Sequence, residues 1–160
     1  MGNEIGQLRE WDEKREQDWD ILKYPIHDTF HHFMQKLNHL YITTPALSAK
    51  DYENAGFQWL DCHQEERCIY AIGRKTADHM IVGIFNFSDK EQKDYKLTIK
   101  GHHTRRTLLH TEWEQYGGTM KKRKENIHLK KKGKTVSLRS HFQNTVEFYK
   151  TNEERIRQKF

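Results

Sequence analysis

The feature that most restricts the fold of this chain is one amphipathic helix followed by a series of short β-type segments. Over residues 26–42 the apolar positions recur mostly at spacings of three and four, which places them on one face of an α-helix. These positions are Ile26, Phe30, Phe33, Met34, Leu37, Leu40 and Tyr41. Pro25 suits the entry of the helix, and Pro45 predicts its end because the residue before a proline avoids helical geometry. Such an apolar face requires a partner surface.

From residue 57 onward, runs of β-forming residues replace the helical pattern. The expected strands are residues 57–60, 68–72, 80–87, 95–99, 107–111, 127–129, 136–138 and 146–148. The polar residues 75–79 are expected to form a hairpin connection between two of these strands. Short strands at this spacing predict a mainly β chain that folds as an antiparallel β-sandwich.

The composition is compatible with a folded core beneath a very polar surface. Hydrophobic residues make up 34% of the 160 residues, and the mean hydropathy is −1.06. Aromatic residues nevertheless make up 12%, and each of them buries a large apolar area. The length fits one ordinary domain or a small domain with an appendage, and the aromatic content argues against full disorder.

Simple sequence patterns argue against a membrane or secreted location and against a disulfide framework or a zinc site. The sequence has no run of about 18 apolar residues, and its acidic N-terminus lacks the apolar region of a secretion signal. We therefore expect a cytoplasmic protein with no membrane partner. Cys62 and Cys68 are too few for a disulfide framework or a four-ligand zinc site, and we expect reduced thiols.

Charge is distributed unevenly along the chain. Residues 1–20 contain seven acids and three bases, whereas residues 121–134 contain eight bases and one acid. The basic segment favours a solvated hairpin at a sheet edge, where lysines also prevent pairing with other chains. A basic module that binds polyanions is a less favoured alternative, and we expect no nucleic-acid partner.

Side chains that commonly carry chemistry form no convincing set. The acids between residues 10 and 20 do not define the carboxylate pair that glycoside chemistry requires. His27 and His31 have the i, i+4 spacing of metal ligands, but no third ligand accompanies them, so we expect no metal and no cofactor. Aromatic faces can also bind sugar rings, and core packing is the simpler expectation for a tryptophan within a strand. The candidate platforms are Trp11, Trp19, Trp59 and Trp113.

A series of motifs occupies the first 61 residues. They are Met1–Gln7, Arg9–Trp11, Asp18–Leu22, Tyr24–His27, Leu37–Tyr41, Pro45–Leu47 and Gly56–Asp61. Together with Asn86-Phe87 and Tyr116–Thr119, they resemble the C-terminal part of bacterial 1,4-α-glucan (glycogen) branching enzymes of the α-amylase superfamily (glycoside hydrolase family 13). The resemblance is dense up to residue 61 and sparse after residue 120.

The resemblance implies a chain in two parts. Residues 1–45 would be the C-terminal remnant of a catalytic (β/α)8 barrel, with the last strand and its outgoing loop at 1–7 and the last helix at 26–42. Residues 46–150 would form the all-β C-terminal sandwich domain, and residues 151–160 a charged tail. The barrel wall would then cover the apolar face of the helix.

Enzymes of this family cleave an α-1,4 glucan, hold the piece as a covalent glycosyl-enzyme and transfer it to a 6-hydroxyl. Their catalytic acids lie on earlier barrel strands, and no residue of this chain matches them. The resemblance therefore implies a fragment of a branching enzyme that is inactive alone, with an α-glucan and the missing barrel domain as partners. The residues expected to line the glucan cleft are Glu4, Gln7, Arg9 and Trp11. The alternative is a stand-alone glucan-binding sandwich that uses Trp59 or Trp113.

Overall fold

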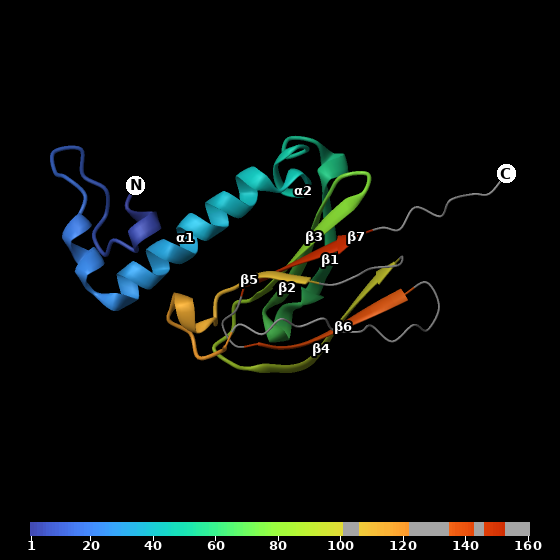
Figure 1. Cartoon of the computed structure of the whole chain (residues 1–160). Helices are drawn as coiled ribbons and strands as arrows, with labels where there is room; N and C mark the ends of the chain where they lie inside the picture. The colour runs from blue at the N-terminus through green and yellow to red at the C-terminus, as the bar shows by residue number, and fades with distance from the viewer. Residues whose placement is uncertain (101–105, 122–134, 143–145, 153–160) are drawn as a thin grey trace. The chain divides into compact units, whose positions relative to one another are not determined.

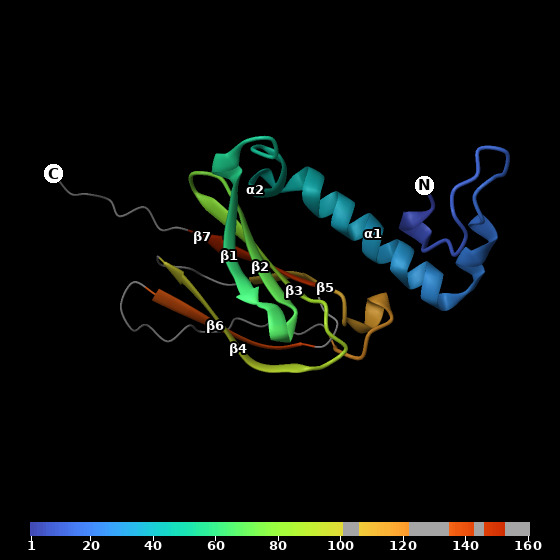
Figure 2. The same cartoon turned by 180° about the vertical axis from the view of Figure 1, so that it is seen from behind.

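The computed structural model describes residues 1–100, 106–121, 135–142 and 146–152. The chain divides into two compact units. Unit 1 consists of Met1–Thr43 and Thr111–Lys122, and unit 2 consists of Thr44–His110 and Arg123–Phe160. Figures 1 and 2 show the elements of both units from opposite sides.

Unit 1 is built around one long helix, α1, which spans Pro25–Thr43 and confirms the helix predicted from the sequence. Pro25 stands at its first position, where a missing N–H costs nothing, and Asp28 lies in the first turn near the positive end of the helix dipole. At the other end, the Thr43 hydroxyl donates to the carbonyl of His39 at 2.7 Å. Phe33 and Leu40 are its buried residues.

Residues 1–7 form a tight turn around the 3-10 helix η1 (Asn3–Ile5). Gly2 and Gly6 flank it with φ angles of 82° and 65°, and Gln7 N–H donates to the Gly2 carbonyl at 3.0 Å. Ile5 is fully buried, and its carbonyl accepts the Nδ1–H of His27 at 2.8 Å. The resemblance implied the last barrel strand here. The structure has a turn instead, because these backbone groups bond within the segment and to His27 rather than to a neighbouring strand.

An aromatic cluster joins residues 111–121 to α1 within unit 1. Tyr116, at the end of the 3-10 helix η5 (Glu114–Tyr116), meets Phe33 edge to face with ring centroids 5.4 Å apart. It also stacks on Trp113 at 6.3 Å and an interplanar angle of 25°. Burial raises the pKa of Tyr116 above its ordinary value. The cluster therefore anchors a segment that is distant from α1 in the sequence.

Unit 2 is an antiparallel β-sandwich, as predicted. One sheet has five strands in the order β1-β2-β3-β7-β5, and the other pairs β4 with β6. The strands are β1 (Phe57–Gln64), β2 (Ile69–Lys75), β3 (His79–Asn86), β4 (Gln92–Lys100), β5 (Arg106–His110), β6 (Thr135–Phe142) and β7 (Val146–Asn152). All of the ladders among the described residues are antiparallel.

Seven of the eight expected strands overlap observed ones. The connection at 75–79 joins β2 to β3 as predicted, with Thr76 N–H donating to the His79 carbonyl at 2.9 Å. The expected strand at 127–129 lies outside the described residues. At the other end of the sandwich sequence, β7 continues through Asn152, so the first two residues of the expected charged tail belong to the sheet.

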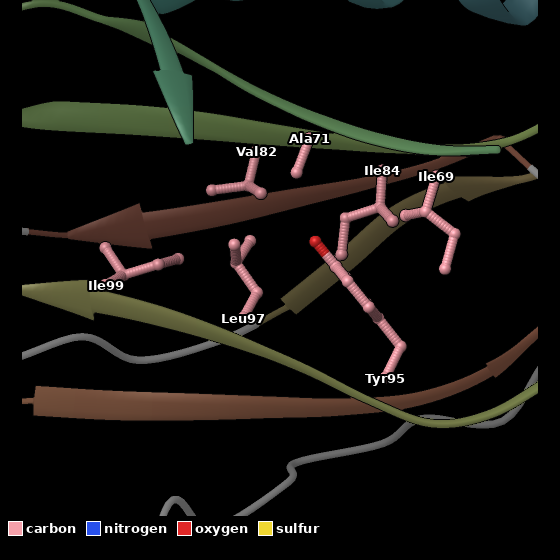
Figure 3. Packing of buried hydrophobic residues seen from close by; sticks show 7 residues of the cluster. All are labelled: Ile69, Ala71, Val82, Ile84, Tyr95, Leu97 and Ile99. Carbon is pink, nitrogen blue, oxygen red and sulfur yellow. The ribbon is translucent and has the colours of Figure 1, made fainter. Parts of the chain in front are cut away.

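The core of unit 2 lies between the two sheets. Alternate residues of β2 and β3 point toward alternate residues of β4, as the two-residue period of a strand requires (Figure 3). The cluster consists of Ile69, Ala71, Val82, Ile84, Tyr95, Leu97 and Ile99, none of which is more than 4% exposed. Across the core, the Tyr95 hydroxyl donates to Asp61 Oδ2 at 3.0 Å.

A short helix, α2 (Pro45–Ser48), is attached to this sandwich at β2. Arg74 Nη2 donates to the Leu47 carbonyl at 2.9 Å and to the carboxylate of Asp51. Ala46 and Leu47 are buried. The arginine therefore holds the residues that lead into the first strand.

Candidate functional site

The loop of residues 7–18 in unit 1 carries most of the residues expected to line a glucan cleft. Arg9 Nε lies 3.1 and 3.0 Å from the two carboxylate oxygens of Asp18. Its other nitrogens donate to the carbonyls of Glu10 and Glu16. One guanidinium therefore satisfies acceptors at both ends of the loop, and this charge-assisted geometry fixes the loop's base.

Gln7 makes a second connection at the same place. Its Oε1 accepts the backbone N–H of Asp18 at 3.0 Å, and its Nε2 donates to the Arg9 carbonyl at 3.2 Å. The structure thus brings Gln7 and Arg9 together through Asp18. Sequence reasoning missed Asp18, because a carboxylate nine residues from an arginine in a charged loop carries no local signal.

The other two expected cleft residues flank Gln7 and Arg9 in the sequence. Glu4 is half-buried in η1, and the Trp11 side chain is 57% exposed at the start of the loop. The polar groups of Gln7 and Arg9 are used to hold the loop. Trp11 is consequently the member of the set with a large apolar surface available for a ligand.

The two histidines with metal-ligand spacing face different partners. His27 donates from Nδ1 to the Ile5 carbonyl, whereas His31 Nε2 accepts from the Gln35 amide at 2.7 Å. Within the described part of the chain, no group of three or more His, Cys, Asp or Glu side chains has an arrangement that would hold a metal ion.

A row of five aromatic rings lies on the outward face of unit 2, and we call it the aromatic row. Its members are Phe57, Trp59, Tyr70, Phe85 and Phe87. Successive ring centroids lie 5.4 Å apart for Phe57 and Trp59 and 6.5 Å apart for Trp59 and Tyr70. The row continues at 5.8 Å from Tyr70 to Phe87 and at 6.1 Å from Phe87 to Phe85. Strand register explains it, because Tyr70 pairs with Phe85 and Trp59 with Ile72.

The aromatic row is partly open to solvent. The Trp59 side chain is 54% exposed and that of Phe87 is 69% exposed. Core packing, the simpler expectation for Trp59, is therefore wrong. A signal was present in the sequence, since Phe57 and Trp59, like Phe85 and Phe87, are two residues apart and so share a strand face.

Trp113 does not belong to an exposed platform. It is only 5% exposed, and its ring stacks on Tyr116 within unit 1. The alternative in which Trp113 supplies a sugar-stacking surface is therefore wrong, because packing leaves almost none of this residue open to a ligand. The basic segment 121–134 lies outside the described residues except for Lys121, which is exposed.

The two antiparallel sheets place unit 2 in the class of all-β sandwich domains. The family model described as the alpha amylase C-terminal all-beta domain matches residues 59–149, and the chain belongs to this family. Two 1,4-alpha-glucan branching enzymes are similar over a longer stretch. The enzyme of Nitrosococcus oceani is 32% identical over 74% of this chain, and that of Rhizobium meliloti is 33% identical over 86%.

The chain spans 16% and 19% of the lengths of these two relatives. Among solved structures, trehalose-6-phosphate hydrolase from Bacillus licheniformis is 15% identical, with a TM-score of 0.46 over 84% of this chain and 20% of that one. In the described part of the present chain, none of the helices has the length and apolar character needed to cross a membrane.

Proposed function

We propose that this chain provides the C-terminal sandwich and the last barrel segment of a 1,4-α-glucan branching enzyme. In this role it completes a catalytic barrel that carries the acids for glucan chain transfer. The observation that carries the proposal is the extent of the similarity. The match to the Rhizobium meliloti enzyme covers 86% of the chain, and only 11 residues follow the family domain. The similarity therefore includes much of the segment before the sandwich.

The structure of unit 1 is compatible with this role. Helix α1 carries a mixture of buried and exposed apolar residues, with Ile26, Tyr41 and Ile42 among the exposed ones. A barrel wall would cover such residues and recover about 25 cal/mol for each Å² removed from water. The proposed cleft residues remain Glu4, Gln7, Arg9 and Trp11, with Asp18 added as the residue that positions Arg9.

A chimera provides the direct test. In the Rhizobium meliloti branching enzyme, the segment matched by this chain is deleted in one protein and replaced by this chain in another. We expect branching of amylose, measured by loss of iodine colour, from the replacement protein and not from the deletion protein. The isolated chain should show none. A well-folded but inactive replacement protein, or branching by the isolated chain, would contradict the proposal.

The cleft residues are tested in the same chimera. Trp11→Ala should raise KM for amylose. Arg9→Ala should also raise KM, because it releases the loop that carries Trp11. Lys14→Ala is the matched control, because Lys14 is exposed in the same loop and its bond to Asp12 is made by the backbone N–H, which the substitution keeps. Equal effects of Trp11→Ala and Lys14→Ala would exclude a specific contact between Trp11 and glucan.

The second candidate function is a glucan-binding module that acts through unit 2. The exposed aromatic row favours it, since ring faces bind the apolar faces of sugars. In affinity electrophoresis on glycogen, Trp59→Ala should then abolish the retardation of the isolated chain. Trp19→Ala is the control, because Trp19 has nearly the same exposure, 52%, and lies in unit 1. An unretarded parent chain would exclude this candidate.

A polyanion-binding module that uses residues 121–134 stays a third and less favoured hypothesis. It requires binding to heparin or nucleic acid that weakens steeply with salt, because counterions are released from the polyanion. Binding that is absent, or that does not change with salt, would exclude it.

A further inference from the structure

A cavity of about 370 Å³ opens between the two sheets of unit 2. It lies where β2 ends, β3 begins and β4 nears its last residue. The apolar part of its wall includes Leu60, Met80 and Ile99, which also border the hydrophobic core or belong to it. Its volume falls within the range of small-molecule sites, which begins at about 300 Å³.

The polar part of the wall is rich in hydrogen-bond donors. It comprises Gln58, Lys75, Thr76, His79 and Thr98. None of the residues that line this cavity in the described structure is acidic. Two acids adjoin wall residues in the sequence, Asp61 after Leu60 and Asp78 before His79, and neither is part of the wall. The Asp61 carboxylate accepts the Tyr95 hydroxyl, and Asp78 is exposed in the turn.

One contact orients the donors. Lys75 Nζ donates to Gln58 Oε1 at 3.3 Å, across the first pair of strands. With its oxygen engaged, the Gln58 amide offers its NH2 group, and the Lys75 ammonium has two further N–H groups. The Thr76 hydroxyl donates to the His79 carbonyl at 3.4 Å, which keeps the turn closed beside them.

We propose that this cavity binds a small phosphate monoester that also has an apolar ring face, such as a hexose phosphate. Lysine is a common phosphate ligand in proteins, and amide and hydroxyl donors suit the remaining oxygens. The apolar wall at Leu60, Met80 and Ile99 contacts the C–H face of the ring. This site does not depend on the branching-enzyme function. It shares one residue, Trp59 of the aromatic row, with the surface of the glucan-binding candidate.

The test uses the 160-residue chain with methyl-labelled methionine and glucose 6-phosphate as the probe. The chain has four methionines, and only Met80 lines the cavity. We expect the Met80 methyl signal to shift on titration, with a Kd below about 1 mM, while the signals of Met1, Met34 and Met120 stay in place. Raised salt should weaken binding because the contact at the cavity mouth is charged.

Variants separate anion recognition from nonspecific effects. Lys75→Met keeps the aliphatic stem and should weaken binding by about tenfold or more, as loss of a hydrogen bond to a charged group predicts. Lys96→Met is the control, because Lys96 is exposed on β4 outside the cavity. If Lys75→Met unfolds, Gln58→Ala is used in its place, and we expect it to weaken binding by a smaller factor.

Three results would overturn the proposal. One is the absence of a Met80 shift at about 10 mM glucose 6-phosphate, ten times the expected upper limit of Kd. Another is equal affinity for glucose, which would make the cavity a neutral sugar site. The third is binding that folded Lys75→Met or Gln58→Ala leaves unchanged.

Discussion

The hydroxyl of Tyr95 donates a 3.0 Å hydrogen bond to the carboxylate of Asp61 across the core of the sandwich. Tyr95 lies on β4 and Asp61 on β1, so this bond links the two sheets. A bulge in β1 between Trp59 and Asp61 sets Asp61 opposite Ala71, a residue of the core face. The same irregularity thus leaves Trp59 on the outer face and turns Asp61 inward.

Removal of this hydroxyl is expected to destabilise unit 2. Tyr95→Phe should lower the free energy of unfolding by about 1–3 kcal/mol, because Asp61 Oδ2 loses the hydrogen bond from the Tyr95 hydroxyl. Urea denaturation followed by circular dichroism measures the change. Tyr70→Phe, which removes a hydroxyl from the outer face, should change stability by less than about 0.5 kcal/mol. Equal losses in both variants would contradict this account.

Stability should also fall at high pH because of Tyr95. Burial, then the hydrogen bond to Asp61 and its negative charge, raise the pKa of Tyr95 well above its ordinary value of 10.0, and Arg67 opposes this to a lesser extent. Above pH 10.0 the unfolded chain has therefore released a proton that the folded chain still holds. The stabilisation is complete below that pH and is lost as the pH rises toward the folded-state pKa. Tyr95→Phe should flatten this decline in the free energy of unfolding; an unchanged slope would exclude Tyr95 as its source.

The turn at Gly118 is expected to tolerate no side chain. A Cβ at this position would lie 2.2 Å from the backbone carbonyl carbon and oxygen of Glu112. The two sides of this turn are tied by Met120 N–H, which donates to the Glu112 carbonyl at 2.8 Å. Gly118→Ala should therefore destabilise unit 1 by about 1–3 kcal/mol or more, and speed amide exchange at residues 111–121. Thr119→Ala, at an exposed position, is the matched control.

Arg74 is expected to stabilise the attachment of α2 to the sandwich. Arg74 forms an ion pair with Asp51, and the two side chains are 17% and 30% exposed, respectively. The Nη2 of Arg74 that contacts Asp51 also donates to the Leu47 carbonyl. Arg74→Met should raise amide exchange in residues 45–51 and cost about 1–3 kcal/mol of unfolding free energy. Asp51→Asn keeps an acceptor oxygen and should cost less. A larger loss from Asp51→Asn would show that charge, and not the bond to Leu47, dominates.

The Arg9–Asp18 contact is expected to order its loop without adding much global stability. Both side chains are partly exposed, at 23% and 32%, and exposed ion pairs contribute about 1 kcal/mol or less. Asp18→Asn should speed hydrogen exchange over residues 9–18 and leave the melting temperature nearly unchanged. Lys23→Ala, which breaks the more exposed pair with Asp20, should alter neither. A large drop in melting temperature for Asp18→Asn would contradict a local role.

Local patterns predicted much of the architecture. The helix over 26–42 was predicted within one residue at each end, because its 3.6-residue period is a property of neighbouring residues. The strands were located for the same reason, and the hairpin at 75–79 follows from its polar residues. Predicted strand ends were less accurate: β1 runs to Gln64 and not to residue 60, because cross-strand pairing with β2 extends it through two irregularities.

Features that depend on distant residues were not predictable in this way. The insertion of β7 between β3 and β5 joins segments more than 35 residues apart in the sequence. The burial of Trp113 requires Tyr116 and helix α1, and the orientation of Arg9 requires Asp18. Each is decided by packing partners that local periodicity does not specify.

The sequence alone determined the location of the long helix and of most of the strands, and the resemblance to branching enzymes. Tertiary structure decided which aromatic side chains are exposed. Trp59 and Trp113 are the same residue type, yet one lies on an open sheet face and the other stacks against Tyr116. The physical reason is that the neighbours a side chain meets in the folded chain, and not its own propensity, set the apolar area that is removed from water.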